Sequence, residues 1–306
     1  MNVLLTGSTG FIGKNIASLG SIHRHVVREG EQHNYQSFFT IDSLDAKTDW
    51  VGAFDGIDVV IHLAGLAHSN SFTSIDYENV NVLGALRLAR EASKHGVQRF
   101  VFVSSIGVNG TYTNKLPFTV DSTVNPHNTY AQSKYEAELE LKKIAEELGL
   151  EVVIVRPTLV YGPCAPGNFG MLTKLVEKLP FLPFSLVSNR RDFIAVQNLA
   201  DLLLTCAVHP NAPGNTFLAS DNETVSIKEF TDAIAEGLGK TIFQFPVPTS
   251  VMRLFAKSIG KSSMVEQLLG DLEVDSSNLK EILGWTPPFT MKQAMSSLQT
   301  LRKQEK

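Results

Sequence analysis

Short stretches made almost wholly of apolar residues recur along the first half of this chain, and amphipathic stretches separate them. A strand that is apolar throughout is buried on both faces, as in parallel sheets that helices cover on either side. The sequence therefore predicts strands at residues 2–6, 24–27, 58–63, 100–104 and 152–156. Helices are predicted between them at residues 11–19, 77–95 and 130–148. The fold class that follows is α/β, with a doubly wound parallel sheet.

A glycine-rich turn follows the first predicted strand and opens the first predicted helix. It has the spacing GxxGxxG and contains Gly7, Thr9, Gly10, Phe11, Ile12 and Gly13. Glycine permits a tight turn and lets a pyrophosphate approach the backbone N–H groups at the start of a helix. After the first strand of a parallel sheet, this pattern indicates a dinucleotide-binding site rather than a merely structural turn.

The second predicted strand ends at a basic residue, where NAD-binding folds often carry an acidic one. Arg28 occupies this position, and Glu29 follows it. A guanidinium group suits the 2′-phosphate of NADP. We therefore expect NADP, with NAD as the alternative because Glu29 is near enough to reach the ribose hydroxyls.

A tyrosine and a lysine lie one helical turn apart at the start of a later predicted helix. Tyr130 and Lys134 therefore share one helix face. A phenol normally loses its proton near pH 10, but a cation beside it favours phenolate. The pair is typical of a group that exchanges protons near neutral pH. Because such spacing also arises by chance, its weight depends on the glycine turn and on Ser105, which follows the strand at residues 100–104.

The composition argues against several classes of function. A chain of 306 residues, 43% hydrophobic and 19% charged, can bury a large core. A formal charge of −4 argues against a dedicated nucleic-acid or anionic-membrane surface, although it allows a local basic patch for phosphates. Cys164 and Cys206 are too few for a disulfide framework or a zinc site, so we expect no metal and a reducing cytoplasm. We also expect a first strand instead of a signal peptide, and no membrane span.

The second half of the chain is less regular, because prolines interrupt it after residue 156. A strand and a helix return at residues 193–208, and helices are predicted near 227–238 and 276–283, with a loop-rich stretch at 245–249. We expect a smaller carboxy-terminal lobe on the substrate side. In this division residues 1–165 plus 192–212 bind the dinucleotide, and residues 166–191 plus 213–306 form the lobe.

Taken in order, these motifs resemble the extended short-chain dehydrogenase/reductase family. The resemblance rests on the glycine turn, the runs at residues 60–65, 103–105 and 156–157, and the Tyr130/Lys134 pair. It spans the chain and is nearest to NAD(P)-dependent, UDP-glucose 4-epimerase-like nucleotide-sugar 4-epimerases and related 4-ketoreductases of surface-polysaccharide synthesis. It implies a Rossmann-type sheet with a smaller α/β carboxy-terminal lobe, a UDP-sugar substrate, and a homodimer paired through the helices at 77–95 and 130–148.

The resemblance also implies roles for particular residues. Catalysis would belong to Ser105, Tyr130 and Lys134, and Lys134 would also bond the nicotinamide ribose. The cofactor would contact Gly7, Thr9, Gly10, Phe11, Ile12, Gly13, Arg28, Asp42, Ser43, Leu63, Ala64, Gly65, Asn81, Val103, Tyr130, Lys134 and Pro157. The substrate would contact Ser105, Asn168 and Arg191. A second phosphate-binding arginine has no clear match, and Arg253 is the nearest candidate.

The two residues after Ser105 narrow the reaction. Dehydratases of this family carry an acidic pair there, whereas this chain has Ile106 and Gly107. Without carboxylates to move the extra protons, dehydration is disfavoured, which leaves hydride transfer at C4 of a UDP-(N-acetyl)hexose. A 4-epimerase and a net NADPH-dependent 4-ketoreductase of a UDP-4-keto-6-deoxy sugar share this machinery. A non-catalytic NADP-sensing regulatory module is disfavoured, because such modules commonly lose the tyrosine and the lysine.

Overall fold

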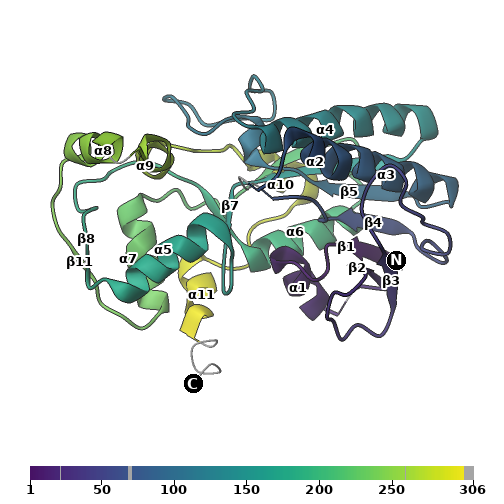
Figure 1. Ribbon diagram of the computed structural model, residues 1–306, viewed down its shortest axis with the longest axis horizontal. Coiled ribbons are helices and arrows are strands. Elements are labelled where there is room, and N and C mark those ends of the chain that lie inside the picture. Colours follow the sequence, from purple (N-terminus) through teal and green to yellow (C-terminus); the bar gives the residue numbers. More distant parts are fainter. Residues whose placement is uncertain (21, 68–70, 259, 300–306) are drawn as a thin grey trace.

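A seven-stranded sheet of order β10-β6-β5-β4-β1-β2-β3 forms the centre of the computed structural model, which describes residues 1–20, 22–67, 71–258 and 260–299 (Figure 1). The strands are β1 (Val3–Thr6), β2 (Arg24–Arg28), β3 (Phe38–Ile41), β4 (Val59–His62), β5 (Arg99–Val103), β6 (Glu151–Pro157) and β10 (Thr216–Ala219). Each pairs with its neighbour in parallel. The expected doubly wound parallel sheet is therefore confirmed.

Helices cover both faces of the sheet. α3 (Ala85–Lys94) and α4 (Thr129–Leu148) lie on one face, and α1 (Phe11–Ser18) and α6 (Val196–Val208) lie on the other (Figure 1). Side chains alternate between the faces along each strand. Leu4 packs into the core beneath α3 and α4, while Val3 and Leu5 pack into the core with α6. This double burial explains why the central strands β1, β4 and β5 are apolar at nearly every position.

The helix expected at residues 77–95 is divided into three segments. α2 (Ser74–Tyr77) leads into a π-helical segment, η1 (Glu78–Gly84), and then into α3. A π-helical turn is rare and often marks a functional position. Here η1 carries Asn81, whose side chain is buried.

The carboxy-terminal lobe is built from short elements around its own apolar core. Its helices are α5 (Gly167–Lys178), α7 (Ile227–Gly237), α8 (Thr249–Ser258), α9 (Ser262–Leu269) and α11 (Met291–Ser296). Two small parallel sheets pair β7 (Leu159–Tyr161) with β9 (Phe193–Ala195) and β8 (Phe181–Leu182) with β11 (Phe243–Gln244). The sequence did not indicate α5, α8 or α9.

β10 and α10 (Ser277–Leu283) belong structurally with the large sheet, although both follow residue 212. β10 pairs with β6 along its whole length, and Leu279 and Leu283 of α10 pack into the core on the α6 face. The domain boundary expected at residues 212/213 therefore assigns β10 and α10 to the lobe, although β10 is a strand of the large sheet and α10 packs into the core beneath it. Within the described ranges, no helix is long and apolar enough to cross a membrane.

Candidate active site

A cavity of about 680 Å³ is lined by residues from both the strand ends of the large sheet and the carboxy-terminal lobe. Its wall contains Ser105, Tyr130 and Lys134 from the sheet side, and Asn168 and Arg191 from the lobe. The structure therefore brings together every residue that the sequence assigned to catalysis and to substrate binding. Val103, Pro157 and Ile12 line the same cavity.

The start of α4 fixes the position of Tyr130. The Asn128 side chain accepts a hydrogen bond from the backbone N–H of Ala131 at 2.8 Å and so caps the helix. This cap places Tyr130 in the first turn, next to the ring of Tyr77, with the ring centroids 6.1 Å apart. Lys134 follows one turn later, on the same helix face.

Burial controls the ionisation of Tyr130. Loss of solvent raises the pKa of the phenol to about 12, while its hydrogen bond with Ser105 acts in the opposite direction. The expected shift towards phenolate is therefore wrong for this structure, because desolvation opposes the charged form more strongly than its neighbours favour it. Near neutral pH, Tyr130 carries its proton.

The Lys134 ammonium group is buried next to the carboxyl end of β5. Its Nζ atom donates a hydrogen bond to the Val103 carbonyl at 3.0 Å and lies 4.8 Å from the ring centroid of Phe102. Burial lowers the pKa of Lys134 to about 8, although Glu138 nearby favours the cation. Lys134 remains mainly protonated at neutral pH and is close to losing its charge.

Ser105 follows β5 and faces Tyr130, while Ser104 belongs to a buried polar network behind the cavity. The Ser105 hydroxyl accepts a hydrogen bond from the Gly107 N–H at 3.1 Å. The Ser104 hydroxyl donates to Glu138 on α4, and Arg156 on β6 donates to both oxygens of the Glu138 carboxylate, at 2.9 and 2.5 Å. This ion pair fixes α4 to the sheet one turn beyond Lys134.

A second cavity, of about 850 Å³, adjoins the first at the strand ends. Leu63, Gly65, Leu66 and Ala67 line both cavities. A Cβ atom on Gly65 would lie 2.8 Å from Asn81 Oδ1 and 3.4 Å from Lys134 Nζ, so only glycine fits at this junction. Together the two cavities form one long groove that ends at Tyr130.

The glycine turn at the wall of the second cavity suits a pyrophosphate. Gly7 has φ +69°, and a Cβ atom there would lie 2.8 Å from the Ala64 nitrogen. On Gly13, a Cβ atom would lie 2.1 Å from the Gly7 carbonyl oxygen. α1 begins at Phe11 without a side-chain cap, so its first N–H groups are available to an anion. These residues would hold a dinucleotide whose nicotinamide end extends towards Tyr130.

The adenosine end of the groove contains an acidic residue that the sequence reasoning missed. Arg28 lines this cavity, but its guanidinium donates to Glu31 Oε1 at 2.9 and 2.7 Å. Thr9 donates to the other oxygen of Glu31 at 2.9 Å. Although burial opposes it, these bonds lower the pKa of Glu31. Arg28 is thus paired with Glu31, which lines the cavity, whereas Glu29 does not. Gly30, directly before Glu31, was the feature in the sequence that could have pointed to this residue. A glycine permits the turn seen there, with φ +80°, after which the Glu31 side chain reaches Thr9.

The other expected cofactor contacts fall into two groups. Those that line the second cavity are Gly7, Thr9, Gly10, Asp42, Ser43, Leu63, Ala64 and Gly65. Phe11, Gly13 and Asn81 line neither cavity. Asn81 is 1% exposed, accepts a hydrogen bond from the Leu66 N–H at 2.7 Å and donates to Ser133 at 3.0 Å. It therefore fixes the shared wall of the two cavities to α4.

On the lobe side, Arg191 is the arginine that faces the catalytic cavity. Its Nη1 donates to the Gly270 carbonyl at 2.7 Å, and burial lowers its pKa to about 10, which leaves it charged at neutral pH. Arg190 is exposed and pairs with Glu273 at 2.8 Å. The choice of Arg191 over Arg190 agrees with this geometry.

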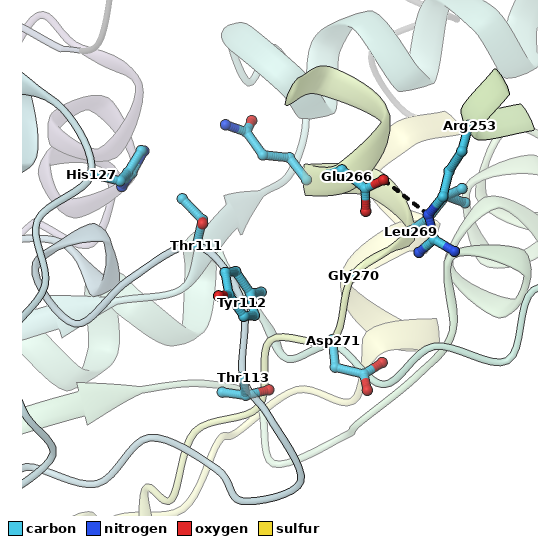
Figure 2. Close-up of a pocket in the computed structure, with 10 residues that line it drawn as sticks. Thr111, Tyr112, Thr113, His127, Arg253, Glu266, Leu269, Gly270 and Asp271 are labelled. Carbon is cyan, nitrogen blue, oxygen red and sulfur yellow. Dashed lines mark hydrogen bonds and ion pairs between the residues drawn. The ribbon is translucent and has the colours of Figure 1, made fainter. Parts of the chain in front are cut away.

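Figure 2 shows a further cavity, of about 600 Å³, beside the catalytic one. Thr111, His127 and Gln267 line both. Arg253 lines only the further cavity and pairs there with Glu266 at 2.9 Å. The structure therefore does not place Arg253 beside Arg191 as a second phosphate ligand. The sequence gave no signal for Gln267 or His127.

The chain matches the model of the NAD dependent epimerase/dehydratase family over residues 3–219. It is 40% identical over 303 residues to a UDP-glucose 4-epimerase of Vibrio cholerae, covering 95% of this chain and 92% of that protein. Among solved structures it is similar to UDP-glucose 4-epimerase of Thermotoga maritima with UDP-glucose, at a TM-score of 0.78 and 21% identity over 100% of both chains. It is also similar to UDP-N-acetylglucosamine 4-epimerase of Bacillus cereus, at a TM-score of 0.78 and 18% identity over 99% of this chain and 96% of that one. The structural likenesses show the fold, and the sequence matches show the family. The chain belongs to the NAD dependent epimerase/dehydratase family.

Proposed function

We propose that this protein is an NAD(P)-dependent 4-epimerase of a UDP-hexose or UDP-N-acetylhexosamine. The observation that carries the proposal is the meeting of Ser105, Tyr130 and Lys134 in one cavity, at the end of a groove suited to a dinucleotide. The identity to a UDP-glucose 4-epimerase over nearly the whole chain supports the same reaction. Ile106 and Gly107 follow Ser105, where a dehydratase would need acidic groups.

In this mechanism, residues of the chain remove and return the proton of the C4 hydroxyl. A bound nicotinamide dinucleotide would take up and return the C4 hydride, and its oxidised ring would bring a positive charge. Tyr130 exchanges the proton of the C4 oxygen, while the Ser105 hydroxyl bonds to that oxygen. The positive charges of Lys134 and of the oxidised ring would favour the Tyr130 phenolate, which takes up the C4 hydroxyl proton as the hydride leaves. The phenol formed in this way returns the proton when the hydride comes back to the ketone, and burial, which raises the pKa of Tyr130 in the protein alone, favours this protonated form.

The remaining residues bind and orient. Lys134 bonds the nicotinamide ribose and keeps a positive charge near the phenol. Asn168 and Arg191 hold the diphosphate of the sugar nucleotide, and Arg191 suits this role because it is charged and its planar fork matches phosphate oxygens. A sugar held at its diphosphate can present either face of C4 to the dinucleotide.

We propose NAD as the cofactor of the unaltered chain. Arg28 was the reason to expect NADP, and its charge is engaged by Glu31. A fixed carboxylate accepts hydrogen bonds from ribose hydroxyls and repels a 2′-phosphate. Arg28 was also the main argument for a net 4-ketoreductase that uses NADPH, and its pairing with Glu31 removes that argument.

The deciding experiment incubates the purified protein with UDP-glucose and, separately, with UDP-N-acetylglucosamine. We expect the corresponding galacto sugar to form with no net change in nicotinamide absorbance. Consumption of NADPH with a UDP-4-keto-6-deoxy sugar, without interconversion of the hexoses, would instead assign a reductase. Dinucleotide binding without either activity would assign a regulatory module.

We further propose a cytoplasmic homodimer that serves surface-polysaccharide synthesis. α3 and α4 pack against each other on one face of the sheet (Figure 1). Leu139 and Leu148 leave apolar surface on the outer side of α4. A two-fold axis beside this surface would pair the two helices with those of a second copy.

A further inference from the structure

α8 and α9 lie at the outer end of the carboxy-terminal lobe and leave apolar side chains on the surface (Figure 1). On α8, Val251, Leu254 and Phe255 are 51%, 71% and 66% exposed, and Ala256 is the buried residue of this helix. Met264 on α9 is 51% exposed. Single exposed apolar residues are ordinary, but three within five positions of one helix form a face that lacks a partner. We call α8, α9 and Lys261, which directly precedes α9, the lobe-tip helices.

The same helices carry an excess of positive charge. The lobe-tip helices carry Arg253, Lys257 and Lys261, and their carboxylate is Glu266, which pairs with Arg253 at 2.9 Å. Lys257 and Lys261 are exposed, and among the described residues neither forms an ion pair. The local excess is thus two positive charges on a chain whose net charge is −4. A net charge sums over the whole surface, so it does not describe this end of the molecule.

We propose that the lobe-tip helices dock the protein on an anionic lipid bilayer. Short helices with an apolar face bordered by lysine and arginine lie in the plane of a membrane interface, where the apolar face is buried and the cations meet lipid headgroups. A second copy of the chain fits this surface poorly. In a two-fold dimer through these helices, Lys257 and Lys261 would face the same cations of the partner.

Docking in this way would bring the bilayer to the rim of the catalytic cavity. Met264 and Leu268 of α9 line that cavity, as do Met171 and Leu175 of α5. Met171 is 53% exposed and Leu175 is 38% exposed, so the rim of the cavity also presents apolar side chains to solvent. The same helix pair therefore contacts the lipid surface and forms part of the cavity entrance.

Flotation with lipid vesicles tests this proposal in the absence of sugar and dinucleotide. The full chain should float with phosphatidylcholine vesicles that contain phosphatidylglycerol, and much less with phosphatidylcholine alone. The fraction of protein bound to vesicles should fall as salt is added, because salt screens the attraction between the lysines and the anionic headgroups. Since no substrate is present, this result stands apart from the success or failure of the proposed reaction.

Two variants separate the apolar from the charged contribution. Leu254→Ser with Phe255→Ser should weaken the partition coefficient by at least about a hundredfold, because two large side chains no longer leave water. Lys257→Gln with Lys261→Gln should weaken it by about fivefold for each cation removed. All four side chains are exposed, so the thermal midpoint of each variant should match that of the unaltered chain.

Matched controls make the same chemical changes elsewhere. Val51→Ser with Leu116→Ser removes two apolar residues that are 78% and 77% exposed, and Lys142→Gln with Lys280→Gln removes two exposed lysines. Both controls should bind vesicles like the unaltered chain. Equal weakening by controls and test variants, or no preference for anionic vesicles, would overturn the proposal. A loss of dimer mass in the Leu254→Ser, Phe255→Ser variant would overturn it too, by assigning the surface to a second copy.

Discussion

Single residues in the catalytic cavity owe their charge state to burial more than to one another. Desolvation raises the pKa of Tyr130 to about 12 and lowers that of Lys134 to about 8. Both shifts favour the uncharged form, as expected where water is displaced. Without a bound dinucleotide, the pair therefore consists of a neutral phenol and a cation that is close to losing its proton.

Replacing Tyr130 by phenylalanine removes the proton exchange and keeps the ring. We expect the Tyr130→Phe variant to lose epimerisation by a factor of about 10² to 10⁴. Dinucleotide affinity, measured by fluorescence quenching, should remain nearly unchanged. Turnover close to that of the unaltered chain would show that another group moves the proton.

The pH dependence of kcat/KM should follow the ionisation of Lys134. Lys134 carries its proton below about pH 8 and loses it as the pH rises further. Because the cation is the form that bonds the ribose and balances a phenolate, kcat/KM should fall as the pH rises through about 8. The ratio kcat/KM follows ionisations that precede sugar binding. In a Lys134→Arg variant, whose guanidinium stays charged, this alkaline fall should disappear. Its persistence would assign the fall to a different group.

Glu31 should control the choice of dinucleotide. Glu31→Gln removes the carboxylate and frees Arg28 for a 2′-phosphate, so the ratio of NADP to NAD affinity should rise on the order of tenfold. Glu29→Gln makes the same charge change on a neighbour outside the cavity and serves as the control. Calorimetric titration with both dinucleotides measures the ratio. An equal response in the two variants would reject the assignment.

Among the elements, α4 is held to the sheet by a buried ion pair. Glu138 is 1% exposed and Arg156 is 4% exposed, and Ser104 and Asn109 complete the network. Removing one partner leaves the other charge buried without compensation. This pair links the helix that carries Tyr130 and Lys134 to β6, the strand that ends at Pro157.

Loss of the Glu138 charge should therefore destabilise the whole protein. Glu138→Gln should lower the free energy of unfolding in urea by about 3–5 kcal/mol. Glu147→Gln breaks the pair between α4 and Arg90, in which the side chains are 53% and 44% exposed, and should cost about 0–1 kcal/mol. Similar losses in the two variants would mean that burial does not decide the strength of these pairs.

For the whole molecule, the proposed dimer depends on the outer side of α4. We expect the unaltered chain to sediment with the mass of two copies and Leu139→Lys to sediment as one. Leu139 is 42% exposed, so a lysine there adds charge to the surface without disturbing the core. Val208→Lys, at the end of α6 on the opposite face of the sheet, should leave the mass unchanged. A dimeric Leu139→Lys protein would place the interface elsewhere.

The sequence predicted the arrangement of the whole molecule less completely than it predicted single residues or elements. β1 and β5 are apolar at every position but one, so their burial on both faces could be recognised from sequence. β10 has only four residues and lies far along the chain, and its place beside β6 depends on contacts that no local pattern records. α8 and α9 were missed although Met252, Val265, Leu268 and Leu269 pack with the lobe core. Both helices are short, and the exposed apolar residues of α8 obscure the one-sided apolar pattern that marks a helix in sequence.

The sequence by itself determined the parallel sheet, the glycine turn and the set Ser105, Tyr130 and Lys134, because strand burial, glycine geometry and helical spacing are local properties. Tertiary structure alone decided which charges are available. It paired Arg28 with Glu31, moved Arg253 out of the catalytic cavity and raised the pKa of Tyr130. Electrostatic interactions depend on distances and burial between segments that are remote in sequence, so they exist only once the chain has folded.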